Sequence, residues 1–228
     1  MRSVCPFSFA LFDLDGTLLD SMYVWARVDE LFFASRGLQL PEDYGKCLGG
    51  MSYRESAIYT VERFHLPDPW EAIVDEWMEL ARREYAQCVP FKPHALEYLR
   101  ALRKMGVRLA VVTAMPRNLF LPCLERHGAV DLFEAICSTD ETGSRGKRTG
   151  EVYLLAAQRL GALPGECLVF EDVYEGVIGA KNAGMRVVCV DDPCSTHRHD
   201  EIAAMAECII QDFSQMDQIH PLPTGWMG

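Results

Sequence analysis

Short runs of apolar residues recur along the chain, separated by longer stretches in which apolar and polar positions are mixed. The runs contain no charged residue and are rich in β-branched or aromatic side chains, which is typical of strands buried on both faces of a sheet. They cover Phe9–Phe12, Leu109–Val112, Ala135–Cys137, Leu168–Phe170 and Val187–Val190. We therefore predict five buried strands.

Helical patterns lie between the later strands. One covers His94–Lys104 and closes at Gly106, and another covers Glu151–Leu160 and closes at Gly161. A glycine just past the last periodic residue is a common end of a helix. Strand and helix therefore alternate, which predicts an α/β fold in which a Rossmann-like parallel sheet has helices on both faces.

The segment that follows the first strand breaks this alternation, because it contains helical patterns and no strand pattern. Its first helix is predicted over Tyr23–Ser35, with Gly37 as its end. We predict that residues 21–88 form an inserted α-helical domain, which we call the cap. Residues 1–20 and 89–228 would then form the catalytic core.

Two further helix starts can be recognised inside the cap. Ser52 is followed three residues later by Glu55, which is the pattern of a capping box. Asp68 is predicted as the N-cap of the next helix, with Pro69 at its first position and Glu71 in its first turn.

Composition and charge narrow the class of protein. Of 228 residues, 49% are hydrophobic and 24% charged, as in ordinary folded globular proteins. The formal net charge is -11, and no cluster of Lys and Arg is present, so we expect no nucleic-acid partner. An acidic protein that binds an anion must supply a metal ion, helix N-termini or a few placed cations at that point.

Cysteine usage and the N-terminal residues bear on location. The nine cysteines are odd in number and show no zinc-site spacing, so we expect reduced thiols in a reducing cytosol. The apolar run Val4–Phe12 is interrupted by Pro6 and ends at Asp13, too short for a signal peptide or a membrane span. We expect a cytoplasmic protein with no membrane partner.

Two carboxylates follow the first predicted strand. Asp13 and Asp15 lie two residues apart, with Gly16 next. In a parallel sheet the carboxyl ends of the strands form the ligand-binding edge. Like charges this close are tolerated when a divalent cation binds them or when one holds a proton, and both conditions suit phosphoryl transfer. An acidic turn at Asp15-Gly16 is the alternative explanation.

A second acidic pair, Glu171-Asp172, follows the strand Leu168–Phe170. Two acidic strand ends can share one Mg²⁺ ion, which prefers hard oxygen ligands and keeps some of its water. Taken alone, the pair is equally typical of a helix N-cap.

Thr113 completes the strand Leu109–Val112. Its hydroxyl and the next backbone N–H, that of Ala114, can receive a phosphate oxygen. A turn or capping role is the commoner explanation for a threonine at such a position.

These motifs occur together in the order typical of one family. Asp-Leu-Asp-Gly-Thr at residues 13–17, then Thr113, then Phe170-Glu171-Asp172 resemble the haloacid dehalogenase superfamily, and the match spans nearly the whole chain. The helical insertion resembles the small cap of the subgroup that includes phosphoglycolate phosphatases, sugar-phosphate phosphatases and β-phosphoglucomutase. The resemblance implies a phosphatase that hydrolyses a small phosphate monoester.

The resemblance also implies a role for each motif residue. Asp13 would attack phosphorus to form an aspartyl-phosphate, and Asp15 would act as acid and then as base. Mg²⁺ would be held by Asp13, the backbone carbonyl of Asp15, Asp172 and Glu171. Thr113, with Ala114, would bind the transferring group.

The family also uses a lysine beside the nucleophile, usually in a Gly-Lys-Pro stretch. Here the corresponding segment starts Gly146-Lys147-Arg148, and Lys147 is our candidate. Because the expected proline is replaced, Arg145 or Arg148 can share or assume the task. A solvated basic loop is the alternative.

The cap of the family covers the site and selects the leaving group. We expect the substrate-facing positions to lie close to the first motif and in the loop before the second cap helix. They are Ser21, Trp25, Met51, Ser52 and Arg54, with Met22 beside them. This weakly charged set suggests a sugar or polyol phosphate.

Two other functions are weighed against hydrolysis. Mutases of the family carry a histidine shortly after the first motif, where this chain has Trp25, although Arg54 can compensate for missing cap cations. A non-catalytic metabolite-binding protein is disfavoured because nucleophile, acid, metal ligands and threonine are all present. We expect either a monomer or a homodimer.

Overall fold

The computed structural model describes residues 7–48, 51–143, 146–193 and 198–216. Its strands form one sheet with the order β3-β2-β1-β4-β5-β6, and every neighbouring pair is parallel. The strands are β1 Phe9–Phe12, β2 Arg108–Thr113, β3 Ala135–Ser138, β4 Cys167–Glu171, β5 Arg186–Val190 and β6 Cys208–Ile210. The predicted α/β fold with a parallel sheet is confirmed.

The five strands predicted from apolar runs are all present, each within one residue of its predicted bounds. The sixth strand, β6, was not predicted. It is three residues long and lies at the edge of the sheet, and only Ile210 in it is fully buried. So short a run, only partly buried, leaves no clear apolar pattern.

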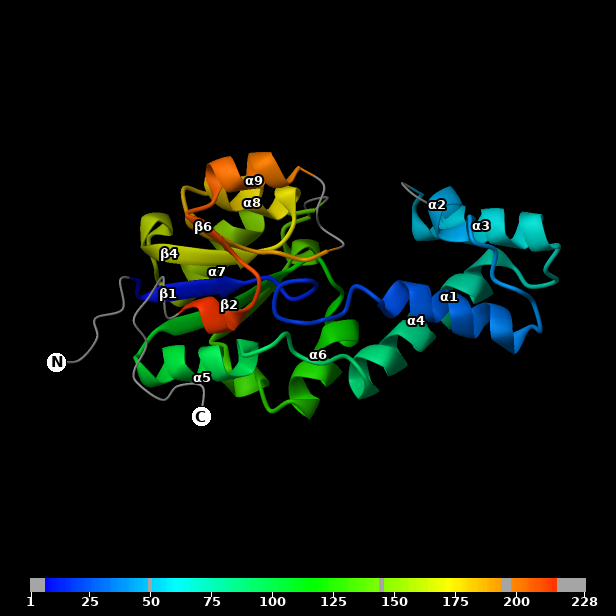
Figure 1. Ribbon diagram of the computed structural model, residues 1–228, viewed down its shortest axis with the longest axis horizontal. Helices are drawn as coiled ribbons and strands as arrows, with labels where there is room; N and C mark the ends of the chain where they lie inside the picture. The colour runs from blue at the N-terminus through cyan, green and yellow to red at the C-terminus, as the bar shows by residue number, and fades with distance from the viewer. Residues whose placement is uncertain (1–6, 49–50, 144–145, 194–197, 217–228) are drawn as a thin grey trace. The chain divides into compact units, whose positions relative to one another are not determined.

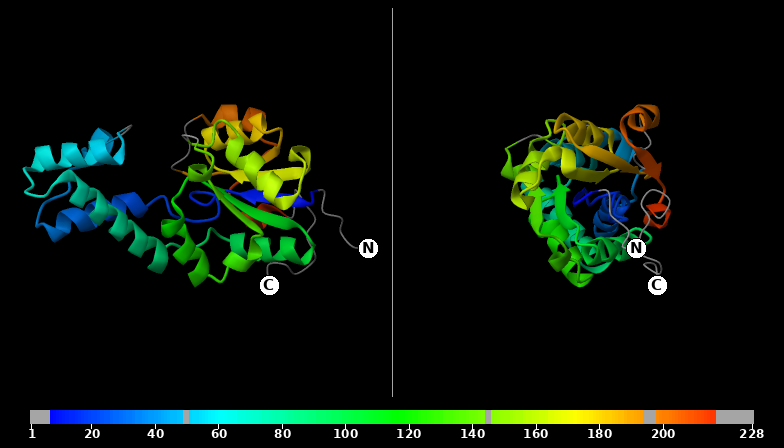
Figure 2. Two further views of the ribbon diagram at one scale, coloured as in Figure 1. Left: turned by 180° about the vertical axis from the view of Figure 1, so that it is seen from behind. Right: turned by 90° about the vertical axis from the view of Figure 1, so that its left-hand side faces the viewer.

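Helices cover both faces of the sheet (Figure 1 and Figure 2). One face packs against α7 Glu151–Leu160, α8 Tyr174–Asn182 and α9 His199–Met205 through a cluster that includes Leu11 and Val169. The other face carries Phe12 and Phe170, whose stacked rings have centroids 4.5 Å apart. On that side lie α5 Ala95–Lys104 and α6 Arg117–Arg126. Alternate strand residues therefore serve opposite layers, as in any sheet buried on both faces.

The chain divides into two compact units, one of Met1–Met22 with Pro90–Gly228 and the other of Tyr23–Val89. We call them the core unit and the inserted unit. Within its described residues the inserted unit contains helices and no strand. The helices are α1 Val24–Ser35, α2 Tyr44–Leu48, α3 Tyr53–Phe64 and α4 Trp70–Gln87.

The helix starts of the inserted unit match the sequence patterns in one case and differ in the other. Ser52 and Glu55 form the reciprocal capping box at the start of α3. The N-cap of α4 is Pro69 and not Asp68, and no side chain caps this end. Pro69 has extended backbone geometry, which proline readily adopts, so the helix begins one residue later than predicted.

The two chain segments that join the units are paired where they leave the core unit. The Asp20 N–H donates to the Pro90 carbonyl at 3.0 Å, and the Lys92 N–H donates to the Leu18 carbonyl at 2.8 Å. The Lys92 ammonium also forms a buried ion pair with Asp192, 2.7 Å away. The insertion therefore starts and ends at neighbouring points of the core unit.

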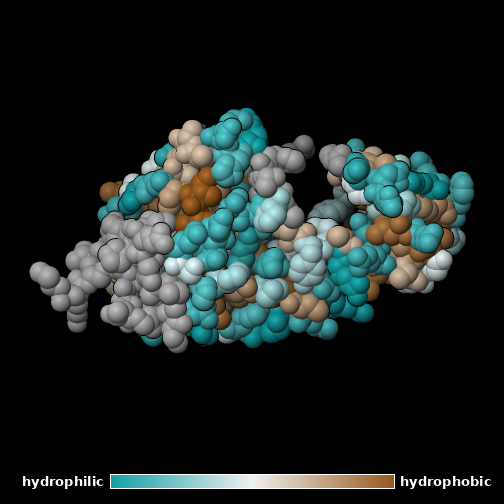
Figure 3. Space-filling view, in the orientation of Figure 1, coloured by the Kyte–Doolittle hydropathy of each residue, from teal (hydrophilic) through white to brown (hydrophobic). Residues whose placement is uncertain are grey.

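Hydrophilic residues dominate the face shown in Figure 3, and hydrophobic residues reach this surface only in small separate groups. None of the helices in the described ranges has both the length and the apolar character that crossing a membrane requires. The cysteines of these ranges form no disulfide.

Candidate active site

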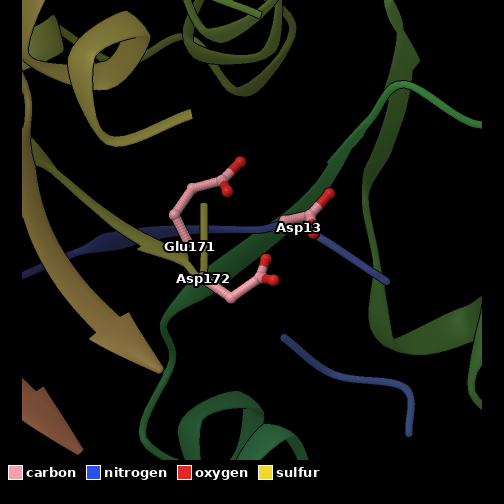
Figure 4. A group of neighbouring side chains, drawn as sticks. All are labelled: Asp13, Glu171 and Asp172. Carbon is pink, nitrogen blue, oxygen red and sulfur yellow. The ribbon is translucent and has the colours of Figure 1, made fainter. Parts of the chain in front are cut away.

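The acidic strand ends lie side by side because β1 and β4 are neighbours in the sheet. Phe12 pairs with Phe170, and the Asp13 N–H continues this ladder by donating to the Phe170 carbonyl at 3.0 Å. Parallel neighbours end at the same edge, so Asp13 emerges next to Glu171 and Asp172 (Figure 4). All three side chains are buried, and each offers a carboxylate oxygen within 4.8 Å of the others.

Lys147 joins two of these acids. Its buried ammonium donates to Asp13 Oδ1 and, at 2.6 Å, to Glu171 Oε1. The loop that carries it is held close to α8, because a Cβ on Gly179 would lie 2.0 Å from the Lys147 carbonyl oxygen. Only glycine permits this close approach of the Lys147 backbone to α8.

Burial and the neighbouring charges shift the pKa values of the residues in this group. Burial raises the pKa of Asp13 to about 7; Lys147 opposes this shift and Asp172 adds to it. Burial likewise raises the pKa of Glu171 to about 7, again against the effect of Lys147. Burial alone would lower the pKa of Lys147, but the two carboxylates outweigh it and raise that pKa. Lys147 therefore pairs with two of the three buried acids, Asp13 and Glu171.

The donor set suits a hard divalent cation. Its members are carboxylate oxygens, which such cations prefer. Glu171 Oε2 is buried and has no hydrogen-bond partner among the described residues, an arrangement that is costly unless a further positive group satisfies it. The backbone also makes room for Asp172, since a Cβ on Gly16 would lie 2.3 Å from Asp172 Oδ2.

Asp15 lies in the turn that follows β1. The turn is closed by hydrogen bonds from the Gly16 N–H to the Leu19 carbonyl and from the Leu19 N–H to the Leu14 carbonyl. Ser21 is buried, and its hydroxyl donates to Asp15 Oδ1 at 2.5 Å. The structure thus places Ser21 against Asp15, whose carboxylate stands outside the group formed by the other three acids.

Thr113 ends β2, the strand on the other side of β1. It is buried, and its hydroxyl oxygen accepts a hydrogen bond from the Met115 N–H at 3.0 Å. Ala114 follows it at the surface. The turn role weighed for Thr113 is therefore present, and phosphate binding by Thr113 and Ala114 stays a prediction.

Four predicted substrate-binding residues belong to the inserted unit. The Trp25 ring lies 5.3 Å from the Tyr53 ring, and the Arg54 guanidinium lies 5.1 Å from the centre of the Trp70 ring. Ser52 is engaged in its capping box, and Met51 is 39% exposed. Their contact with a substrate stays a prediction.

The arginines considered as alternatives to Lys147 differ from it in position. Arg148 is exposed and pairs with Glu175 at 2.9 Å. Arg145 lies outside the described residues. Within the ranges that the structure covers, Lys147 is the cation of this loop that reaches Asp13.

Two residues at the site were not predicted. The buried Thr17 hydroxyl donates to Asp172 Oδ1 at 3.0 Å, and the buried Tyr153 hydroxyl donates to Glu171 Oε1 at 2.6 Å. Thr17 belongs to the first motif, which was a signal that could have been used. Tyr153 fits the apolar pattern of α7, so nothing in the pattern separates it from the core.

Comparison with known proteins places this site in a family. The family of haloacid dehalogenase-like hydrolases matches residues 8–184. A validoxylamine A 7'-phosphate phosphatase of Streptomyces hygroscopicus subsp. limoneus is 32% identical over 225 residues, which cover 96% of this chain and all of the relative. Hexitol phosphatase A of Escherichia coli is 33% identical over 195 residues, which cover 84% of this chain and 87% of the relative.

The similarity to solved structures also supports this family. The crystal structure of a HAD family hydrolase from Deinococcus radiodurans, with bound phosphate and sodium, has a TM-score of 0.72 and 27% sequence identity. The similarity covers 94% of this chain and 95% of that one. The chain therefore belongs to the haloacid dehalogenase-like hydrolase family and is one of its phosphatases.

Proposed function

We propose that this protein is a Mg²⁺-dependent phosphatase that hydrolyses a small sugar or polyol phosphate through an aspartyl-phosphate on Asp13. The observation that carries the proposal is the buried contact of the Lys147 ammonium with Asp13 Oδ1, at the point where Glu171 and Asp172 also end their strand. A nucleophile, a fixed cation and the donors for a second cation meet there. Phosphoryl transfer depends mainly on such positioning and neutralisation of charge.

The first half of the reaction uses Asp13 and Asp15. A carboxylate oxygen of Asp13 attacks phosphorus while the bond from phosphorus to the ester oxygen breaks, and Asp15 gives its proton to the leaving oxygen. The charge of Lys147 favours the ionised form of Asp13, because it opposes the effect of burial on the pKa of that carboxyl. The Ser21 hydroxyl holds the Asp15 carboxylate by a hydrogen bond in the resting protein.

The second half restores the enzyme. Asp15, now ionised, takes a proton from water, whose oxygen attacks phosphorus of the aspartyl-phosphate and releases inorganic phosphate and Asp13. Mg²⁺, held by Asp13, Asp172, Glu171 and the Asp15 carbonyl, would neutralise charge on the transferring group. Thr17 would keep Asp172 oriented through its hydrogen bond.

The substrate class is supported by the relatives. One is named for a phosphate of validoxylamine A and another for hexitol phosphates. The predicted substrate-facing residues of this chain carry one charge, on Arg54, as suits a neutral, hydroxyl-rich leaving group. We further infer that the enzyme acts in the cytoplasm, where its cysteines would stay reduced.

The test is release of inorganic phosphate from a panel of sugar phosphates, polyol phosphates, phosphoglycolate, nucleotides and 4-nitrophenyl phosphate. Each compound is assayed with Mg²⁺ and with excess chelator, for the wild type and for Asp13→Asn. We expect Mg²⁺-dependent release that falls at least about 1,000-fold in the variant, because the nucleophile is lost. The matched control is Asp29→Asn, which alters a partly buried carboxyl of the inserted unit and should stay within about twofold.

Either of two results would contradict the proposal. Release that persists at the wild-type rate in Asp13→Asn would exclude Asp13 as the nucleophile. Interconversion of hexose phosphates without net release would identify a mutase instead.

A further inference from the structure

One oxygen of Glu171 accepts two hydrogen bonds while the other accepts none. Both the Lys147 ammonium and the Tyr153 hydroxyl donate to Oε1, each at 2.6 Å, and Oε2 has no hydrogen-bond partner in the part of the chain that the structure describes. Glu171 and Tyr153 have no exposed surface. In such a dry environment each donor strongly affects how the carboxylate attracts the other.

The Tyr153 hydroxyl has little freedom to move. The residue lies in the first turn of α7, and its ring belongs to the apolar cluster between that helix and the sheet. A Cβ on Gly179 would lie 3.0 Å from Tyr153 Cε2, so α8 also closes against the ring. The same glycine lies against the Lys147 carbonyl, and packing therefore fixes the tyrosine and the lysine loop together.

Lys147 contacts two acids, Asp13 and Glu171, and these contacts have opposite effects on the proposed reaction. Its contact with Asp13 puts positive charge beside the nucleophile, whereas its contact with Glu171 draws it away. A hydroxyl that donates to Glu171 Oε1 takes up part of the negative charge on this oxygen. The pull of Glu171 on the ammonium is then weaker, and the lysine stays beside Asp13.

We propose that Tyr153 is a positioning residue for the phosphatase reaction, acting through Glu171 to hold Lys147 against Asp13. The inference rests on the proposed function, since it concerns the same site. It concerns the placement of the lysine and not its presence. A misplaced Lys147 ammonium lowers the rate of the chemical step more than it weakens substrate binding, because the transition state depends more strongly on geometry than the bound ground state does.

The test compares Tyr153→Phe with Tyr44→Phe, using 4-nitrophenyl phosphate and Mg²⁺. Both variants remove one hydroxyl from a buried tyrosine with a defined hydrogen bond. The Tyr44 hydroxyl lies 2.7 Å from Thr60 Oγ1 in the inserted unit, far along the chain from every acid of the site. Steady-state kcat and KM are measured per folded molecule, and Tm is measured for both.

We expect kcat of Tyr153→Phe to fall about tenfold with KM changed less than about threefold. The Tyr44→Phe variant should keep the wild-type kcat. Its Tm should fall by about as much as the Tm of Tyr153→Phe. If Tyr153→Phe does not fold, Tyr153→Leu, which also lacks the hydroxyl, is measured in the same way.

Three results would overturn the assignment. They are a kcat within twofold of the wild type, a change confined to KM, or a loss of kcat of equal size in Tyr44→Phe. Any of these in an active wild-type enzyme leaves the proposed function standing. A wild type that releases no phosphate from any compound contradicts the proposed function itself, and the role of Tyr153 with it.

Discussion

The two buried acids that share Lys147 make the stability of the metal-free protein depend on pH. The pKa values of Asp13 and Glu171 are about 7 in the folded protein, above their ordinary values of 3.8 and 4.5. At pH values between the ordinary pKa values of these acids and about 7, the folded protein holds more protons than the unfolded chain. The free energy of unfolding therefore rises as pH falls through 7, and the cost of the two ionised acids is fully present above it.

We expect the Tm of the metal-free wild type to rise as pH is lowered from about 8 to about 5.5, and this rise to shrink in Asp13→Asn. Thermal unfolding in chelator at a series of pH values measures both. Exposed acids whose pKa values are lowered by arginines, such as Glu79, lose their stabilising effect at lower pH and do not disturb this window. A wild-type Tm that does not rise as pH is lowered, or that rises no more than the variant's, would contradict the expectation.

At the residue scale, strand-end reasoning identified the acids that the structure brings together, and the resemblance to the family identified the lysine. Asp13 and Asp172 could be found because they directly follow buried strands, and the order of strand and helix puts those ends on one edge. Tyr153 could not be found, because a tyrosine on the buried face of a helix has the same pattern whether or not its hydroxyl reaches an acid. The ion pair between Arg148 and Glu175 could not be found either, because the two residues are 27 positions apart and meet only in the folded chain.

At the element scale, the close approach of α8 to the lysine loop is the contact most sensitive to change. In Gly179→Ala the new methyl group would meet the Lys147 carbonyl oxygen, and either the helix or the loop must shift. We expect a loss of roughly 1–3 kcal/mol in the free energy of unfolding and at least about tenfold in kcat. Chemical denaturation and the phosphate-release assay measure the two effects.

The control for this variant is Gly165→Ala. Gly165 has no atom within 4 Å of its added Cβ and lies in the short helical turn before β4. It should change stability by no more than about 0.5 kcal/mol and leave kcat unaltered. Equal effects of the two substitutions would show that the approach of α8 is not what places the lysine.

The elements themselves were predicted well where apolar runs were continuous or helix ends carried a signal. The bounds of α7 and β1 match the sequence patterns. The edge strand β6 was missed because Cys208 and Ile209 are only partly buried there. The start of α4 was placed one residue early because Asp68 and Pro69 are both common near a helix N-terminus, and the extended backbone of Pro69 decides between them.

At the scale of the whole molecule, the paired joining segments make the inserted unit separable. Asp20 and Pro90 are already hydrogen-bonded, so a short Gly-Ser linker can replace residues 23–89 without stretching the core unit. We expect this variant to unfold cooperatively and to keep Mg²⁺-dependent hydrolysis of 4-nitrophenyl phosphate. Its preference for the best sugar or polyol phosphate over this generic ester should fall at least about tenfold, because four of the proposed selecting residues are removed with the inserted unit.

Circular dichroism during denaturation and kcat/KM for the two esters measure these outcomes. A variant that retains the full preference would place substrate selection in the core unit. One that does not fold would show that the core unit depends on the insertion.

The position of β1 in the sheet has a consequence for synthesis on the ribosome. In the sheet β1 lies between β2 and β4, and β4 is made about 150 residues after β1. Until β4 emerges, one edge of β1 has no partner, and Thr17 lacks the aspartate that its hydroxyl will bind. The nascent chain thus carries Asp13, the proposed nucleophile, for about 150 residues of synthesis before Glu171 and Asp172 can join it. An unpaired apolar strand of this kind is a point where chaperones bind or where incomplete chains aggregate.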